Sequence, residues 1–184
     1  GAERANEGVK KSALREAVMI QMTWPGAPTL YYGDEAGLCG WTDPDNRRTY
    51  PWGNEDYELI EFHRYMITLH KNLPALRYGS LKQLLAGQQL IAYGRMYRTN
   101  RCVVAVNNRE GALQVELPVW ELGVCDGQVM RRLMLSYGDG YNAGIEDYEV
   151  KDGKLALELP GCSAVLFSVG AGDFRSEMQM SDRS

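Results

Sequence analysis

Two stretches in the first part of the chain have apolar residues at helical spacing. From Val9 to Trp24 apolar side chains recur every three or four positions, and Pro25-Gly26 ends the pattern. A second pattern of this kind runs from Leu59 to Leu73, and acidic residues including Asp56 lie where its first turn would complement the helix dipole. The sequence therefore predicts two amphipathic helices.

A short apolar run, Pro28–Gly33, lies between these two helices and is bounded by Pro and Gly. Such a run is typical of a strand that is buried on both faces in a parallel sheet. A helix followed by a buried strand is half of a β/α unit. A single parallel strand leaves backbone groups unpaired unless it has neighbours on both sides. Residues 1–75 are therefore expected to be a piece of something larger that needs a partner.

From Leu76 onward the period of the hydrophobic pattern changes to two. Apolar and polar residues alternate over Leu113–Leu117 and over Leu155–Leu159, which predicts half-buried strands. Turn signals recur about every ten residues. Among them, Asn107–Gly111 and Lys151–Gly153 are expected to be hairpin turns. A β-sandwich is the simplest architecture for this half, with its boundary near Pro74–Ser80.

The composition is that of an ordinary globular protein. The chain has 184 residues, of which 45% are hydrophobic and 24% charged, and its net charge is −4. Lys and Arg are spread along the sequence, so we expect no nucleic-acid partner. No apolar stretch approaches the ~20 residues of a membrane-spanning helix, so no membrane partner is expected. Gly1–Lys11 lacks the apolar core of a secretion signal. The localisation stays open, with a cytoplasmic protein slightly favoured over a secreted one.

Nothing in the sequence points to a metal or a cofactor, and we expect neither. The four cysteines form no Cys-x-x-Cys pair, which argues against a zinc site and a disulfide framework and favours reduced, mostly buried thiols. His63 and His70 are two helical turns apart, about 10.5 Å, too far to share a metal ion. Gly138–Asp147 lacks the spacing of a calcium loop and is expected to be a long hairpin loop.

The most informative segment is Thr23–Trp52, TWPGAPTLYYGDEAGLCGWTDPDNRRTYPW. It resembles the alpha-amylase family of glycoside hydrolases, particularly the neopullulanase, cyclomaltodextrinase and maltogenic amylase branch. The matching motifs are a Pro-Gly-x-Pro turn, a Tyr-Tyr-Gly-Asp-Glu strand, an Asp-Pro-x-x-Arg-Arg loop and a Pro-x-Trp motif whose spacer residue is missing here. These motifs occur in order at Pro25–Pro28, Tyr31–Glu35, Asp43–Arg48 and Pro51-Trp52. Leu73–Gly79 further resembles the entry to the C-terminal sandwich of that family.

The resemblance implies an α+β fold with a particular organisation. Residues 1–75 would be the last β/α unit of a (β/α)8 barrel, with the eighth strand, its loop and the eighth helix. Residues 76–170 would be an antiparallel C-terminal β-sandwich, and residues 171–184 a flexible tail.

The resemblance also implies a chemistry that this chain does not carry alone. The family uses an Asp nucleophile, a Glu general acid/base and a second Asp on the fourth, fifth and seventh barrel strands. No segment of this chain resembles those three strands, and no Asn-His-Asp motif occurs before Val9. We therefore expect no catalytic residue in this chain. The chain is expected to be an inactive part of a retaining enzyme that hydrolyses alpha-1,4 and alpha-1,6 glucans.

The residues that the resemblance places at a sugar site are Asp43, Arg47 and Trp41. A carboxylate accepts hydrogen bonds from two vicinal hydroxyls, a guanidinium donates in a fixed fork, and an indole stacks on a sugar face. The alternatives are a surface ion pair for the two charged residues and packing against Trp52 for Trp41. The adjacent carboxylates Asp34 and Glu35 would point to opposite faces of a strand, so we interpret them as structural.

The expected partners are an alpha-glucan oligosaccharide and either the remainder of the barrel or another copy of this chain. Two other functions stay open at this point. One is a stand-alone carbohydrate-binding sandwich with an aromatic platform of Tyr93, Tyr97 and Trp120, residues that are otherwise expected in the core or in cross-strand pairs. The other is a structural or oligomerising domain.

Overall fold

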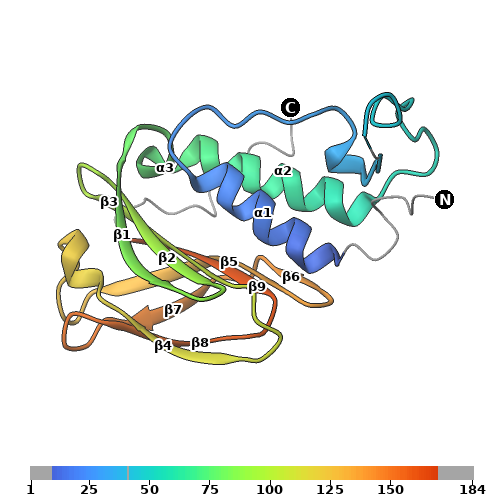
Figure 1. Cartoon of the computed structure of the whole chain (residues 1–184). Coiled ribbons are helices and arrows are strands. Elements are labelled where there is room, and N and C mark those ends of the chain that lie inside the picture. The colour runs from blue at the N-terminus through green and yellow to red at the C-terminus, as the bar shows by residue number, and fades with distance from the viewer. Residues whose placement is uncertain (1–9, 41, 170–184) are drawn as a thin grey trace.

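The molecule consists of three layers. The structure is a computed structural model that describes residues 10–40 and 42–169 of the chain. Helices form one outer layer, a seven-stranded antiparallel sheet forms the middle layer, and a two-stranded sheet forms the other outer layer (Figure 1).

The helical layer contains the two predicted helices and a short third one. Helix α1 (Lys11–Thr23) and helix α2 (Tyr57–Asn72) lie side by side on one face of the large sheet, and α3 (Pro74–Tyr78) follows directly (Figure 1). Asp56 caps α2, because its Oδ1 accepts a hydrogen bond from the Leu59 N–H at 3.2 Å. The periodicity thus predicted both long helices to within two residues.

The second half of the described chain is built from antiparallel strands, as predicted. The large sheet has the order β1-β2-β3-β9-β5-β6, and β7 also pairs with β5. Its strands are β1 (Ser80–Gly87), β2 (Leu90–Tyr97), β3 (Asn100–Asn107), β5 (Val129–Tyr137), β6 (Gly140–Asn142), β7 (Glu146–Glu149) and β9 (Ser163–Val169). The small sheet pairs β4 (Leu113–Leu117) with β8 (Leu155–Leu159).

The burial of the strands follows from their place in the layers. In β8 buried and exposed residues alternate, because one face of the small sheet lies on the large sheet and the other faces solvent. Strands β3 and β9 are buried along almost their whole length, since the helices cover one face of the large sheet and the small sheet covers the other.

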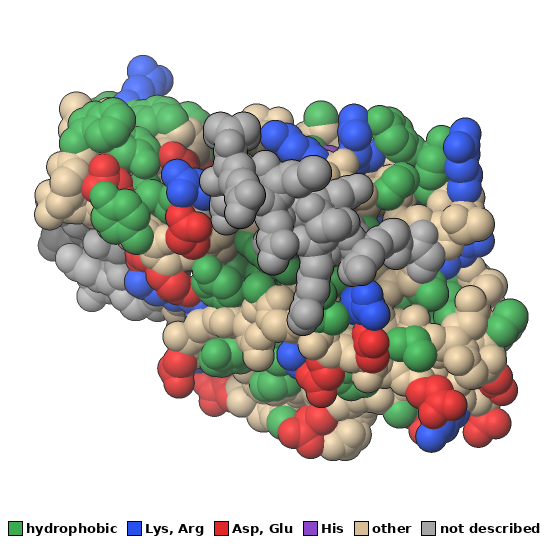
Figure 2. Space-filling view, turned by 180° about the vertical axis from the view of Figure 1, so that it is seen from behind, with side chains coloured by type: hydrophobic (Ala, Val, Ile, Leu, Met, Phe, Trp, Pro, Cys, Tyr) green, Lys and Arg blue, Asp and Glu red, His purple; other side chains and the backbone are tan. Residues whose placement is uncertain are grey.

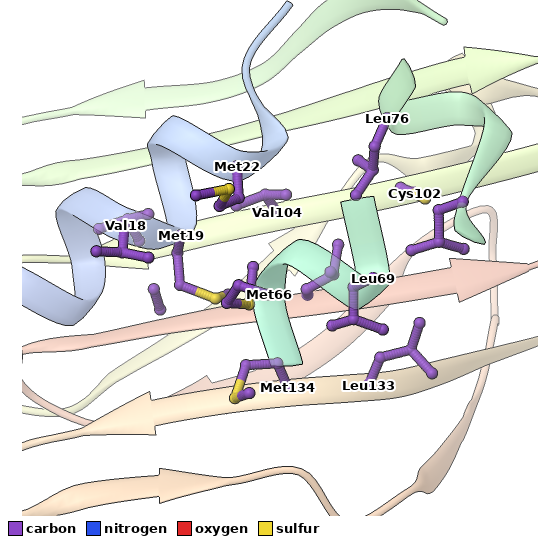
Figure 3. Close-up of a cluster of buried hydrophobic side chains, with 14 of the residues drawn as sticks. Val18, Met19, Met22, Met66, Leu69, Leu76, Cys102, Val104, Leu133 and Met134 are labelled. Atoms are coloured by element: carbon purple, nitrogen blue, oxygen red, sulfur yellow. The ribbon is translucent and has the colours of Figure 1, made fainter. Parts of the chain in front are cut away.

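Two apolar cores hold the layers together. One lies between the helices and the large sheet, where Met19 and Met66 meet Val104 and Leu133 (Figure 3). The other lies between the two sheets and includes Phe167. Burying one such side chain contributes about 1.5–3 kcal/mol. Because many side chains of the helices are buried in this core, their combined burial binds the helical layer to the sheet.

The predicted strand at Pro28–Gly33 is wrong. That segment is irregular and leads into a short 3-10 helix, η1 (Asp34–Ala36), so the structure does not show the β strand of the expected barrel unit. The physical reason is that no strand among the described residues lies beside it to pair with its backbone groups. Tyr31 and Tyr32 are exposed instead of buried.

The connection at Asn107–Gly111 also differs from the prediction. It is not a hairpin turn, because β3 pairs with β2 and β9 whereas β4 pairs with β8. The chain crosses here from the large sheet to the small one. The division into domains 1–75 and 76–170 stays a prediction, and the predicted tail 171–184 lies outside the described residues.

None of the described helices is both long and apolar enough to cross a lipid bilayer.

Glu16 on α1 is a carboxylate with little access to solvent. Its Oε2 accepts a hydrogen bond from Asn108 Nδ2 at 2.7 Å, and its Oε1 is buried without a partner among the described residues. It lines an open cavity of about 370 Å³ between α1 and strands β2 and β3. Burial raises the pKa of Glu16, against the opposing effect of the Asn108 hydrogen bond.

Glu16→Gln is expected to raise the melting temperature at pH 7.5 by about 2–4 °C. The glutamine keeps an acceptor for Asn108 and removes a buried charge. Because the folded state holds the Glu16 proton more tightly, stability is lost as pH rises from the ordinary glutamate pKa through the folded one. The gain should therefore shrink as pH approaches 4, which thermal denaturation between pH 4 and 8 measures.

The matched control is Glu110→Gln, which neutralises an exposed carboxylate paired with Lys10. It should not gain stability toward neutral pH. A Glu16→Gln effect that does not vary with pH would show that the carboxylate is not destabilised by burial.

Candidate functional site

The loop that carries the candidate sugar-binding residues starts at Gly33. Gly33 has a φ of 88°, and a Cβ atom there would lie 2.6 Å from Leu38 Cδ2, so only glycine fits this turn. The Gly33 N–H donates a hydrogen bond to Glu35 Oε2 at 3.0 Å. Asp34 and Glu35 do not lie on a strand, and the Glu35 carboxylate stabilises the turn.

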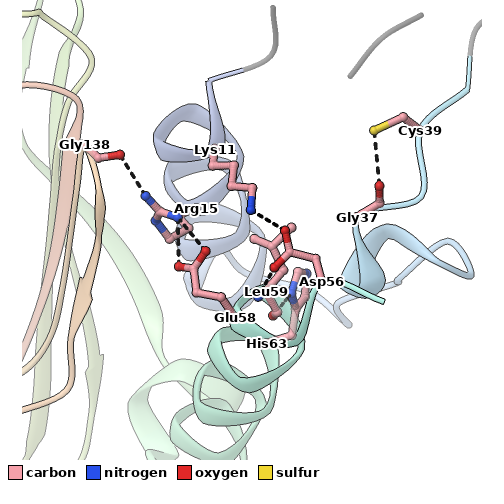
Figure 4. A network of polar contacts seen from close by, with 9 residues as sticks. All are labelled: Lys11, Arg15, Gly37, Cys39, Asp56, Glu58, Leu59, His63 and Gly138. Carbon is pink, nitrogen blue, oxygen red and sulfur yellow. Dashed lines mark hydrogen bonds and ion pairs between the residues drawn. The ribbon is translucent and has the colours of Figure 1, made fainter. Parts of the chain in front are cut away.

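Helices α1 and α2 fix both ends of this loop. The Asp56 N–H donates to the Ala36 carbonyl oxygen at 3.0 Å, and the Asp56 carboxylate forms an ion pair with Lys11 (Figure 4). Burial opposes the ionisation of Asp56, but its hydrogen bond from Lys11 and others from the backbone keep the pKa of this carboxyl below its usual value. The loop is therefore attached to the helical layer on both sides.

A second set of contacts joins the same helices to the large sheet. Arg15 is fully buried, and its Nη1 lies 2.9 Å from Glu58 Oε1 (Figure 4). Its Nη2 donates to the carbonyl oxygen of Gly138 at 3.0 Å. A single guanidinium thus connects α1, α2 and the turn after β5.

Arg48 holds the tip of the loop in shape. Its Nη2 donates to both carboxylate oxygens of Asp45 at 2.6 Å, and its carbonyl oxygen accepts from the Tyr32 hydroxyl at 2.8 Å. A bidentate pair of this kind restricts both side chains more than a single contact does. These contacts were not predicted, although the spacing of Asp45 and Arg48 permits them.

Asp43 and Arg47 are brought together on the outside of this loop. Arg47 Nε lies 2.7 Å from Asp43 Oδ1, and the two side chains are 68% and 58% exposed, respectively. An exposed ion pair contributes at most about 1 kcal/mol to folding, so its charges are free to meet a ligand at little cost to stability. The third predicted residue, Trp41, lies outside the described residues.

The same segment also carries two pairs of aromatic side chains. The rings of Tyr50 and Trp52 are 4.6 Å apart, and Trp52 is 79% exposed. The rings of Tyr31 and Tyr32 are 4.8 Å apart, and both are exposed. Tyr50 was not predicted as a site residue, although its position two residues before Trp52 was the available signal. An exposed aromatic face is a surface on which a sugar ring can stack.

The two histidines lie on α2, outside this loop. The His63 Nδ1–H donates to the carbonyl oxygen of Leu59 at 2.8 Å, and His70 Nδ1 lies 2.7 Å from that of Met22. Both histidines are thus bound to helix backbone, and His63 is buried. No group of three or more metal-binding side chains occurs in the described part of the chain.

The four cysteines are all free, but only Cys102 is fully buried, so the expectation of mostly buried thiols is wrong. Cys125 is exposed, and Cys39 Sγ lies 3.3 Å from the Gly37 carbonyl oxygen (Figure 4).

The aromatic platform considered for the sandwich does not form. Tyr93 is buried in the core under the helices, where its hydroxyl lies 2.6 Å from Thr23 Oγ1. Tyr97 lies on the same side of the large sheet, half-buried. Trp120 is exposed on the 3-10 helix η2 (Val119–Leu122), whose apolar residues pack on the opposite side of that sheet. The three rings therefore cannot bind one ligand.

Comparison with known proteins identifies the protein family to which this chain belongs. No protein-family model matches the chain. It is 31% identical over 173 residues to an amylopullulanase from Thermoanaerobacterium saccharolyticum, covering 88% of this chain and 13% of that protein. Neopullulanase 2 from Thermoactinomyces vulgaris is 38% identical over 120 residues, covering 63% of this chain and 20% of that protein.

Solved structures give the same result. The structure of an alpha-amylase from Anoxybacillus superposes with a TM-score of 0.73 at 28% identity, covering 86% of this chain and 32% of that one. The chain belongs to the alpha-amylase family. It corresponds to the C-terminal region of these proteins and spans only a small part of the first curated relatives.

Proposed function

We propose that this chain is the C-terminal part of a retaining alpha-glucan hydrolase and supplies a substrate-binding loop to it. The observation that carries the proposal is the preformed, exposed Asp43–Arg47 pair. It lies in a segment that matches alpha-amylase family proteins, whose named members include amylopullulanase and cyclomaltodextrinase.

The chemistry of the pair suits a sugar with vicinal hydroxyls. The Asp43 carboxylate accepts from two hydroxyls, and Arg47 orients it while donating its remaining N–H groups to ring or hydroxyl oxygens. Trp52 and Tyr50 offer apolar faces in the same segment, and Trp41 is proposed as a further contact to the sugar.

Catalysis in this proposal comes from residues outside the chain. Retaining hydrolysis requires two carboxyl groups ~5–5.5 Å apart across the scissile bond, one as nucleophile and one as acid/base. The family's catalytic motifs have no counterpart in this sequence. The remainder of a barrel, in the same or another polypeptide, is the partner that would provide them.

Asp43→Asn is expected to weaken binding of maltoheptaose roughly tenfold or more, since it removes a charge-assisted hydrogen bond worth about 1.5–3 kcal/mol. The melting temperature should stay nearly unchanged, because the side chain is exposed. The dissociation constants are measured by titrating wild type and variant with the oligosaccharide, followed by protein NMR.

Glu61→Gln is the matched control. It breaks another exposed ion pair, with Arg64 at 2.7 Å, on helix α2. It should leave maltoheptaose binding unchanged. If Asp43→Asn and wild type bound maltoheptaose with equal affinity, the Asp43–Arg47 pair would be a surface ion pair that binds no sugar.

A further inference from the structure

Four side chains form a continuous stack where α3 ends and β2 turns into β3. The guanidinium carbon of Arg77 lies 4.8 Å from the centre of the Tyr78 ring, and that of Arg98 lies 5.3 Å from the centre of the Tyr97 ring. The two tyrosine rings are 5.5 Å apart. We call these four residues the Arg–Tyr surface.

This end of the molecule carries positive charge that no carboxylate among the described residues neutralises. Among the described arginines, only five have no ion pair, and four of these five cluster here. They are Arg77, Arg95, Arg98 and Arg101. In Figure 2 the upper right, where this end of the molecule lies, shows Lys or Arg and hydrophobic side chains without an acidic one.

The charge on Arg95 is buried beneath the Arg–Tyr surface. Its side chain donates to the carbonyl oxygens of Thr23 at 2.6 Å and Gly79 at 2.8 Å, and its Nε has no partner among the described residues. Its neighbours Tyr93 and Cys102 do not compensate it, because burial raises the pKa of each to about 12 and keeps both neutral at pH 7. An uncompensated cation in a low-dielectric site increases the positive potential at the nearby surface.

Arg77 Nη1 donates to the Lys71 carbonyl oxygen at 3.5 Å, whereas the side chain of Arg98 has no hydrogen-bond acceptor among the described residues. Cation–π attraction to a tyrosine ring leaves the N–H groups at the edge of a guanidinium available to a ligand. Arg98 has a φ of 49° in the two-residue turn between β2 and β3, a position that favours Gly or Asn. Neither the Tyr78 nor the Tyr97 hydroxyl has a hydrogen-bond partner within the described part of the chain.

We propose that the Arg–Tyr surface binds phosphate ester groups carried on an alpha-glucan chain. The guanidinium forks of Arg77 and Arg98 match the oxygens of a phosphate, and the tyrosine hydroxyls donate to the phosphate or to neighbouring sugar oxygens. A neutral glucan would leave the cluster of cations uncompensated, so the ester group is what the surface selects. The glucan part of this assignment rests on the proposed function, whereas the phosphate part rests on the stack and its charges alone.

The test is electrophoresis of the full 184-residue chain through gels that contain neutral alpha-glucan, phosphorylated alpha-glucan or phosphocellulose. Phosphorylated alpha-glucan should retard the wild type at least about fivefold more strongly than either of the other two polymers does. Added salt should reduce this difference. Arg77→Gln/Arg98→Gln should abolish the preference. Arg109→Gln is the matched control, because it removes an exposed arginine without an ion pair whose Nη2 donates to the Gln88 carbonyl oxygen.

Three results would overturn the proposal. They are equal retardation by neutral and phosphorylated alpha-glucan, equal loss in the Arg109→Gln control, and equal retardation by phosphocellulose, which would remove the assignment to alpha-glucans. Asp43→Asn separates this site from the proposed substrate loop. It should retain the preference for phosphorylated glucan whether or not it weakens maltoheptaose binding.

Discussion

Replacing Phe62 by alanine is expected to lower the free energy of unfolding by about 3–5 kcal/mol. Phe62 lies on α2 and is fully buried in the core between the helices and the large sheet, where its ring is 5.1 Å from that of Tyr141 on β6. Its removal deletes apolar contacts on both sides of that core and leaves a cavity that the packed sheet can fill only in part.

The measurement is urea denaturation followed by far-UV circular dichroism and by tryptophan fluorescence. Both signals should shift together, because the helices and the sheet share this core. Tyr57→Ala is the control on the same helix, where the side chain is exposed, and it should change stability by about 0.5 kcal/mol or less. Loss of the helical signal while the rest of the chain stays folded would mean that the helices are not an integral layer of the fold.

The parts of the fold that were predictable depend on local periodicity. Helices α1 and α2 and strands β4 and β8 each show their buried face in the spacing of their own apolar residues. The segment Pro28–Gly33 was mispredicted because its character depends on strands beside it, which periodicity within the segment does not reveal. The crossing from β3 to β4 was missed because a turn motif does not specify which strands pair.

The candidate site was predictable to a similar extent. Asp43 and Arg47 are four residues apart, so their contact needs only a compact loop. The buried arginines were not predictable, because Arg15 and Arg95 donate to carbonyl oxygens far away in the sequence, at Gly138 and Gly79. No charge pattern in the sequence distinguishes such residues from exposed arginines.

We propose that this chain contributes glucan binding but no hydrolysis. Without the nucleophile and the acid/base, the chemical barrier is not lowered by the many orders of magnitude that enzymes provide. The purified chain is therefore expected to release no reducing sugar from maltoheptaose, although the oligosaccharide should bind to its loop.

One NMR experiment on the chain with maltoheptaose tests both halves of this claim in the same sample. We expect shifts of backbone resonances confined to the neighbourhood of Asp43–Arg47 and no new anomeric signals relative to a heat-inactivated control. New reducing-end signals that grow with time and with protein concentration would contradict it, because they would show that this chain carries catalytic carboxylates of its own.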